Sequence, residues 1–304
     1  MTREELNDEI SKELMKEQKK EVRGKIIKKI IKGIFLFTIF SFLFFAYTTY
    51  VSTSLIRVNE YRIQSEKLPK SFNGLKIIHF SDTHLGSSFQ LEDLKKVRKL
   101  SNERKPDIIV FTGDFIYKKN LTQKEIEKIT KELKKMKASI GKYAILGDED
   151  TEKVSTIFNQ SDFTILRNEY DFLYKEKDNP ILLIGLSSLL KNKQDITSAY
   201  QYFEDPTHNS NIYTISILHE PDLIKNVQSS YHSDLYLAGH SHNGQIRIPF
   251  LNIGLISQNG AKTYNQPFYQ EKDSKIYISS GLGTKNGFRL FCRPSINFYR
   301  ISNS

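Results

Sequence analysis

The chain of 304 residues has room for one large domain with attachments or for two small domains. Its single cysteine, Cys292, excludes an internal disulfide framework. The formal net charge of +10 raises the question of nucleic-acid binding, but the basic side chains do not gather into one groove-like cluster, and much of the excess lies in residues 16–32. We therefore expect no nucleic-acid partner.

The N-terminal segment, residues 1–32, is charged and carries a narrow apolar stripe at helical spacing. The stripe is formed by Leu6, Ile10, Leu14, Val22, Ile26 and Ile30. We expect a solvated cytoplasmic helix next to the membrane. Docking of this helix to a partner helix or to anionic lipid is the alternative.

An apolar segment without any charged residue follows over residues 33–56. About 20 apolar residues span the hydrocarbon core of a bilayer, so we expect a transmembrane helix over residues 33–52. Tyr47 and Tyr50 lie at its far end, where aromatic rings favour the membrane interface. A buried core helix is the alternative, but soluble helices are rarely uncharged over this length. A cleavable signal peptide is disfavoured because the basic leader is long and no small-x-small site follows it.

The basic residues from Lys16 to Lys32 determine the expected topology. By the positive-inside rule they place the N-terminus in the cytoplasm. We therefore expect a single-pass protein of the cell membrane, anchored by its N-terminal helix, with everything after Val51 outside the cytoplasm.

A linker is expected over residues 53–70, and strands then alternate with helices across residues 71–304. The expected strands occupy residues 75–80, 108–111, 143–146, 181–184, 213–218, 235–238, 276–279 and 296–301. Amphipathic helices are marked by Leu91, Leu94, Val97 and Leu100, and by Ile126, Ile129, Leu133 and Met136. This alternation predicts an α/β sandwich.

Five of the expected strands end directly in an Asp or a His, in the segments SDTHLG, TGD, GDED, HEPD and GHSHNG. Functional groups gather at the carboxyl ends of strands in such sheets. Along an extended segment Asp82 and His84 point the same way, and so do His240 and His242. Asp114, from the middle strand, can bridge two ions with its two oxygens. Mixed imidazole and carboxylate ligands suit Mn, Fe or Zn better than Ca or Mg.

This series of motifs resembles the calcineurin-like metallophosphoesterases. Asp-x-His, Gly-Asp, a box like Gly-Asn-His-Asp, a lone His and Gly-His-x-His occur in this order, and the segments GHSHNGQIRIP and SGLGT…FCRP resemble the membrane-associated bacterial subgroup. The resemblance covers residues 71–304 and implies a two-sheet β-sandwich flanked by helices, the calcineurin-like αββα fold, with two divalent metal ions. Among Mn, Fe and Zn we favour Mn. The ligands that it implies are Asp82, His84, His242 and the bridging Asp114 for one ion, and Asp114, Asp148, His219 and His240 for the other.

The GDED segment departs from the family pattern, because Asp148 and Glu149 stand where the family has Asn and His. A carboxylate at residue 148 can replace the amide oxygen, but it leaves two divalent ions a formal charge of about +1 where the family site has about +2. In the family, the His at this position assists departure of the leaving group or stabilises the charge on the phosphoryl oxygens. General acid–base catalysis of this kind raises the reaction rate roughly 10²–10⁴-fold. Nearby metal ions favour the ionised form of a Glu. We therefore expect Glu149 to weaken or redirect catalysis.

Two functions of different classes follow. The first is a membrane-anchored phosphoesterase that hydrolyses phosphate monoesters, diesters or a pyrophosphate bond, with a lipid-linked substrate such as a UDP-diacylglucosamine as one candidate. The second is a catalytically weakened module that keeps its metals and binds phosphorylated ligands without turnover. The filled ligand positions favour the enzyme.

The other candidate residues receive structural interpretations. His79 is expected in the core or the sheet, and His208 and His232 in solvated loops. Gly239 and Gly244 are expected to permit tight turns and close approach of the backbone to a ligand. Asn243, next to His242, is expected to be a turn residue, with contact to substrate as the alternative. Arg289 and Arg293 are expected at the surface, with contact to phosphate as the alternative.

Overall fold

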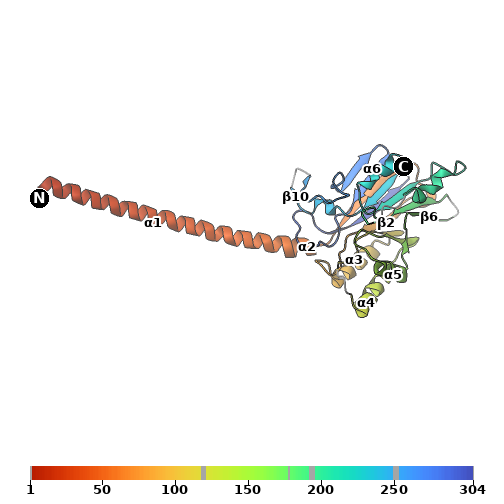
Figure 1. Ribbon diagram of the computed structural model, residues 1–304, viewed down its shortest axis with the longest axis horizontal. Coiled ribbons are helices and arrows are strands. Elements are labelled where there is room, and N and C mark those ends of the chain that lie inside the picture. Colours follow the sequence, from red (N-terminus) through yellow and green to blue (C-terminus); the bar gives the residue numbers. More distant parts are fainter. Residues whose placement is uncertain (1, 118–120, 177–178, 192–195, 249–252, 304) are drawn as a thin grey trace. The chain divides into compact units, whose positions relative to one another are not determined.

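The computed structural model describes residues 2–117, 121–176, 179–191, 196–248 and 253–303 (Figure 1). The chain divides into two compact units, residues 1–48 and residues 49–304. The first unit consists of the helix α1 (Arg3–Ala46). Helical structure continues beyond it through η1 (Tyr47–Val51) and α2 (Ser52–Ser54).

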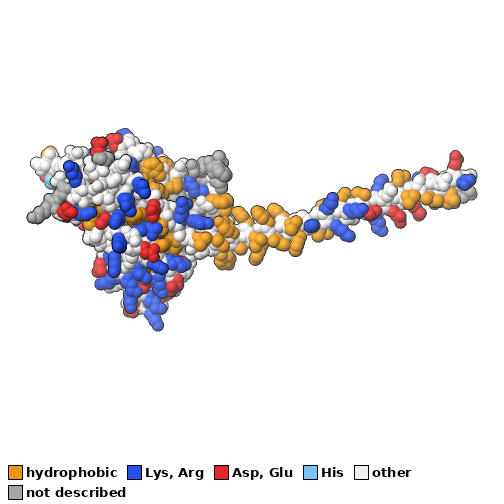
Figure 2. Space-filling model, turned by 180° about the vertical axis from the view of Figure 1, so that it is seen from behind, with side chains coloured by type: hydrophobic (Ala, Val, Ile, Leu, Met, Phe, Trp, Pro, Cys, Tyr) orange, Lys and Arg blue, Asp and Glu red, His pale blue; other side chains and the backbone are white. Residues whose placement is uncertain are grey.

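This N-terminal helix is long and apolar enough to cross a membrane. Counted from Leu6 to Ser54 it has 49 residues, and its most apolar stretch has a mean hydropathy of 2.1 with 0 % of that stretch buried. Its large apolar side chains are exposed, Phe35 at 63 % and Phe42 at 71 % among them. Figure 2 shows apolar side chains gathered along this stretch of the helix, with charged side chains toward its N-terminal end.

The second unit contains two mixed six-stranded sheets (Figure 1). The first has the order β1-β14-β2-β3-β4-β5, with β1 (Arg57–Gln64), β14 (Ser295–Ser302), β2 (Leu75–Phe80), β3 (Ile108–Thr112), β4 (Gly141–Ile145) and β5 (Thr164–Ile165). The second has the order β12-β13-β9-β8-β7-β6, with β12 (Phe268–Glu271), β13 (Ser274–Ile278), β9 (Leu235–Ala238), β8 (Thr214–Leu218), β7 (Ile181–Leu186) and β6 (Glu169–Leu173). A short ribbon joins β10 (Arg247–Ile248) and β11 (Ile253–Gly254). Strands β2, β3, β4 and β5 are parallel neighbours, and so are β7, β8, β9 and β13.

The central strands are apolar on both faces because both faces are covered. Successive residues of a strand point to opposite faces. Ile77 of β2 packs in a core shared with β7, β8 and β9 of the other sheet, whereas Ile78 packs in a core with the helices of the first sheet. In β7, Leu183 faces the shared core and Leu182 the helical layer of the second sheet. The result is four layers, helix, sheet, sheet and helix.

The helical layers consist of short helices, of which α3 and α4 begin with a capping box. The first sheet is covered by α3 (Leu91–Glu103), α4 (Gln123–Lys134) and α5 (Glu152–Gln160), and the second by η3 (Thr197–Glu204) and α6 (Leu223–Gln228). Short 3₁₀ turns occur at η2 (Lys70–Phe72) and η4 (His242–Gly244). Thr122 caps α4 by accepting from the backbone N–H of Glu125, whose carboxylate accepts from the N–H of Thr122.

The two-sheet sandwich flanked by helices is confirmed, and each expected strand is present with ends shifted by up to two residues. The expected linker is wrong for residues 57–64, which form β1 and pair in parallel with β14. Strand β1 has the sequence RVNEYRIQ, and only Ile63 is buried. It is an edge strand with polar and charged side chains on both faces, so its sequence lacks the apolar alternation of a half-buried strand. The short strands β5, β6 and β12 were missed as well.

Candidate dinuclear metal centre

The motifs identified in the sequence meet at one edge of the sandwich. Strands β2, β3 and β4 of the first sheet are parallel, as are β8 and β9 of the second, so the loops that follow them leave from carboxyl ends. Gly113 lets the two sheets approach there, because a Cβ atom on it would lie 2.5 Å from His219 Nδ1. Its φ of +92° also favours glycine.

One cluster of candidate ligands combines Asp82, His84 and His242. Each offers one ligand atom, and these atoms lie within 4.8 Å of one another. His242 Nε2 is 3.7 Å from Asp82 Oδ1, and the rings of His84 and His242 stack with centroids 5.4 Å apart. All three side chains are buried, so an ion between them would be enclosed by protein.

A second cluster combines Asp114, Asp148, His219 and His240. His219 Nε2 lies 3.2 Å from Asp148 Oδ1, and His240 Nδ1 lies 3.5 Å from the same oxygen. Asp148, the residue at the family's Asn position, therefore points into the cluster.

Asp114 faces both clusters with different oxygens. Its Oδ2 is 3.7 Å from His84 Nε2, and its Oδ1 is 3.6 Å from His219 Nε2. This is the geometry that a carboxylate bridging two ions requires.

Backbone carbonyls hold the imidazoles of the second cluster in one tautomer. His219 Nδ1 donates to the carbonyl of Thr112 at 2.7 Å, and His240 Nε2 donates to the carbonyl of Asn259 at 2.7 Å. A carbonyl can only accept, so the outer nitrogen carries the hydrogen and the inner nitrogen presents its lone pair to the cluster. Both rings are therefore oriented as metal ligands.

The loops reach this geometry through unusual backbone conformations. The extended conformation expected for the paired motifs is wrong: φ is 48° at Asp82, 40° at His84, 61° at His240 and 47° at His242. Asp114 has a φ of 59°. Positive φ is uncommon in non-glycine residues and concentrates at functional sites. The side chains of each pair thus converge because the chain turns sharply at both members, not because they alternate along a strand.

The electrostatics of the second cluster fit a bound cation. Burial acts to raise the pKa of Asp114, but the imidazoles of His219 and His84 outweigh it and hold that pKa well below its usual range. Burial acts to lower the pKa of His219, but Asp114 and Asp148 raise it well above its usual value. When metal is absent, these carboxylates favour a second proton on His219, at the inner nitrogen that otherwise presents a lone pair. A divalent ion takes the place of such a proton, which is why metal binding releases protons.

Asp150 explains part of the acidic crowding in GDED. Its buried carboxylate accepts hydrogen bonds from the backbone N–H groups of Asp114 at 2.8 Å, Phe115 at 2.8 Å and Gly147 at 2.9 Å. It thereby ties the loop after β3 to the loop after β4. Burial and the neighbouring Asp114 raise the pKa of Asp150 to about 6, against the effect of these donors. The role of Asp150 could not be predicted from the sequence, because two of its three partners are backbone groups in a loop about 35 residues away.

Glu149 lies at the mouth of the clusters and forms an ion pair with Lys285. Its Oε2 atom is 3.5 Å from His84 Nδ1, and its backbone N–H donates to Asp114 Oδ1 at 3.1 Å. His84 and then Lys285 lower the pKa of the Glu149 carboxyl, despite partial burial. Lys285 belongs to the segment SGLGT-KNG and was missed, because an isolated lysine in a glycine-rich loop carries no motif.

The expectation that Arg289 is a surface residue is wrong. It is fully buried, and its guanidinium donates to the carbonyls of Ser280, Gly283 and Cys292. Its Nη2 atom lies 3.2 Å from His242 Nδ1. A buried guanidinium is tolerated when its donors are paired; both Nη atoms of Arg289 have partners, whereas its buried Nε has none among the described residues. Arg289 therefore packs behind a candidate metal ligand.

The structural expectations for His79, His208, His232 and Arg293 are confirmed. His79 is buried in β2 between Tyr299 and Thr112, whereas His208, His232 and Arg293 are exposed. Asn243 has a φ of 51° in the turn η4, and a Cβ on Gly239 would lie 2.8 Å from Asp82 Oδ2. A Cβ on Gly244 would collide with Gly254, so this glycine permits close backbone approach.

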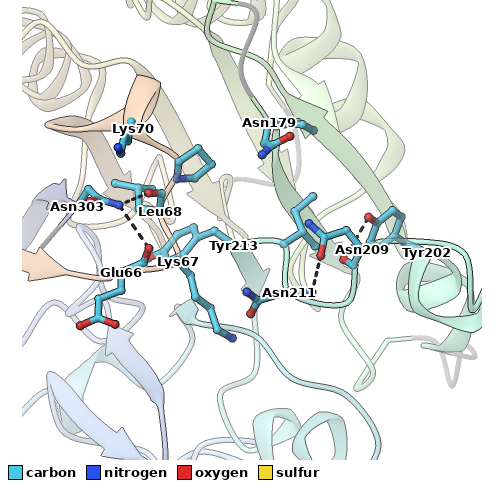
Figure 3. A pocket seen from close by; sticks show the side chains of 13 residues that line it. Glu66, Lys67, Leu68, Lys70, Asn179, Tyr202, Asn209, Asn211, Tyr213 and Asn303 are labelled. Carbon is cyan, nitrogen blue, oxygen red and sulfur yellow. Dashed lines mark hydrogen bonds between the residues drawn. The ribbon is translucent and has the colours of Figure 1, made fainter.

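A separate hollow of about 480 Å³ lies where β2, β7 and β8 begin (Figure 3). Lys67, Tyr202, Asn211, Tyr213 and Asn303 are among the residues that line it. The candidate ligands follow the other ends of the strands, so this hollow belongs to the opposite edge of the sandwich.

Comparison with known proteins agrees with this site. The model of the family described as Calcineurin-like phosphoesterase matches residues 75–244. The metallophosphoesterases YkuE and YkoQ of Bacillus subtilis are 32 % and 30 % identical, over 86 % of this chain in each case and over 90 % and 96 % of their own lengths. The UDP-2,3-diacylglucosamine pyrophosphatase LpxG of Chlamydia trachomatis is 28 % identical over 83 % of this chain and 91 % of its own.

The chain belongs to the calcineurin-like phosphoesterase family. It is accordingly a metal-dependent hydrolase of phosphoester bonds. The family depends on a dinuclear metal centre, and this chain has clustered His and Asp side chains that could hold metal ions.

Proposed function

We propose that the protein is a membrane-anchored dinuclear-metal phosphoesterase that hydrolyses phosphate esters or a pyrophosphate bond in a lipid-linked substrate. The position of Asp114 carries this proposal, because its two oxygens face two separate ligand clusters. We assign Asp82, His84, His242 and Asp114 to one ion and Asp114, Asp148, His219 and His240 to the other. The mixed imidazole and carboxylate ligands suit Mn, Fe or Zn, and Mn is the first metal to test.

When bound, the two ions supply the charge that polarises the phosphoryl group and activates the attacking water. The chain's own residues orient that chemistry. The carbonyls of Thr112 and Asn259 keep the lone pairs of His219 and His240 directed inward. Asp150 holds the backbone of Asp114, and so keeps the proposed bridge between the clusters.

The choice of a lipid-linked substrate rests on two observations. The relative LpxG is named a UDP-2,3-diacylglucosamine pyrophosphatase. The apolar helix leads directly into the phosphoesterase unit, whose first residues line a hollow of about 590 Å³ together with Lys285. A hydrolase of the UDP-diacylglucosamine type is thus the specific candidate.

The proposed topology is a single membrane span with the N-terminus in the cytoplasm. The basic residues that precede the apolar helix support this orientation through the positive-inside rule. The catalytic unit then lies outside the cytoplasm.

Asp148 and Glu149 favour one alternative, a metal-binding module with weak or no turnover. The discriminating experiment uses the full-length protein in detergent with bis-p-nitrophenyl phosphate and with lipid pyrophosphates, in added Mn and after chelation. Metal-dependent hydrolysis supports the enzyme. Binding of inorganic phosphate by metal-loaded protein without hydrolysis of any of these substrates supports the module.

A further inference from the structure

The ion pair between Glu149 and Lys285 places a cation beside both candidate metal clusters. Glu149 is linked to the first cluster through His84, 3.5 Å away, and to the proposed bridge through its N–H bond to Asp114. Lys285 is 38 % exposed and Glu149 32 % exposed, so the pair is in contact with solvent and accessible to a ligand.

The loop that carries Lys285 is packed directly on the site. A Cβ on Gly283 would collide with the carbonyl of Thr83, between the ligands Asp82 and His84, and a Cβ on Gly281 would lie 2.7 Å from His242 Nδ1. Ser88 further ties this loop down by accepting from the N–H of Thr284 at 2.8 Å. The backbone next to Lys285 is therefore held in place, although its side chain is long.

The charge of the site shows what Lys285 contributes. Two divalent ions would be balanced in full by the four carboxylates of Asp82, Asp114, Asp148 and Glu149. A neutral centre attracts a phosphate anion poorly. The ammonium group of Lys285 leaves the assembly with one positive charge. Its pKa is raised because Glu149, Asp114 and Asp148 outweigh its partial burial, so it stays protonated at neutral pH.

Lys285 also lines the hollow of about 590 Å³ next to the site, with Ser87, Tyr117 and Asn286 among its neighbours. The ring of Tyr117 stands edge-on to His84, with centroids 6.5 Å apart. An ammonium group has three donors, and the ion pair with Glu149 uses one of them. The two remaining N–H groups of Lys285 can donate hydrogen bonds to a ligand that lies between the hollow and the metal clusters.

We infer that Lys285 is a substrate-binding residue that contacts the phosphoryl oxygens, with Glu149 as the anchor that positions it. This inference deepens the proposed function and rests on it. The ammonium group of Lys285 thus attracts the phosphoryl group, whereas the carboxylate of Glu149 alone would repel that group. Glu149 serves the reaction through Lys285 and is a positioning residue.

The test measures binding of inorganic phosphate to the Mn-loaded, full-length protein by calorimetry, with metal content checked in each variant. We expect Lys285→Met to weaken phosphate binding roughly 10–100-fold, the worth of a charge-assisted hydrogen bond. Lys285→Arg should restore most of that loss. Lys134→Met is the matched control, since Lys134 forms an exposed ion pair with Asp162 on another face of the unit and should bind phosphate like the wild type.

A second variant tests the anchoring role. Glu149→Gln should weaken phosphate binding in the wild-type background and have little further effect when combined with Lys285→Met, because both residues act through one contact. The inference is overturned if Lys285→Met binds phosphate with wild-type affinity at full metal content. It is also overturned if Glu149→Gln weakens phosphate binding as much in the Lys285→Met background as in the wild type. A wild-type protein that binds phosphate through Lys285 but hydrolyses no phosphoester leaves this inference standing and overturns the proposed function.

Discussion

Gly147 provides a test of the proposed bridge without changing any ligand. It directly precedes Asp148, and a Cβ atom built on it would lie 2.6 Å from the backbone nitrogen of Asp114 and 3.0 Å from its carboxyl carbon, and would collide with its Oδ1. Ordinary contact begins at 3.4 Å, so Gly147→Ala pushes the Asp114 backbone away by about 0.8 Å. Metal–ligand distances tolerate changes of about 0.2 Å. The carboxylate therefore cannot keep its place between the two clusters.

We expect Gly147→Ala to lower metal affinity at least about 10-fold, the smaller effect seen when groups behind metal ligands are changed. The assay is metal content of the purified full-length protein by mass spectrometry, followed by Mn titration. Gly185→Ala is the matched control. Its Cβ would meet the side chains of Leu166 and Ile145 in the sandwich and none of the candidate ligands.

Both variants are expected to lower the thermal midpoint of unfolding, since each adds a methyl group to a packed region. Only Gly147→Ala should lose metal in the folded state. A Gly147→Ala protein with wild-type metal content and Mn affinity refutes the reasoning, because Asp114 would then have moved without consequence.

Three further predictions concern the bridge, the helical layer and the topology. Asp114→Asn should lose at least one of the two metal ions, because a neutral amide offers one ligand oxygen where a bridge needs two; a full metal complement in this variant contradicts the assignment. Glu132 of α4 pairs with Arg98 of α3 at 2.9 Å and with Lys135 at 2.7 Å, and these partners outweigh burial and lower its pKa from the ordinary 4.5. The pairing therefore stabilises the fold above pH 4.5, and this stabilisation is lost as the pH falls through the lower pKa of the folded state. Glu132→Gln should lower the free energy of unfolding in urea by about 1 kcal/mol at pH 7. A difference between variant and wild type that persists unchanged at pH 3 argues against a stabilising role for the ionised Glu132. Protease added to intact cells should digest the unit that follows Val51, whereas protection of that unit while an external control protein is cut would reverse the proposed orientation.

The sequence by itself determined the architecture and the positions of the candidate ligands. Strands such as β2 and β8 consist mainly of apolar residues, with few polar ones such as His79 and Ser216, and this property is local. The rule that functional groups follow the carboxyl ends of parallel strands then brings Asp82, Asp114 and His219 to one edge. The apolar helix could be recognised for the same reason, because length and composition suffice.

Only the tertiary structure decided the roles of Asp150, Lys285 and Arg289. Asp150 is one of three acids in a row, and nothing local distinguishes the one that accepts two backbone hydrogen bonds from the loop after β3 and a third from Gly147. Lys285 pairs with a residue 136 positions earlier, and Arg289 is buried against carbonyls that the final loop presents. A polar side chain is stable inside a protein only when partners satisfy it. Those partners come from distant segments, so the fold has to bring them together before the residue acquires its role.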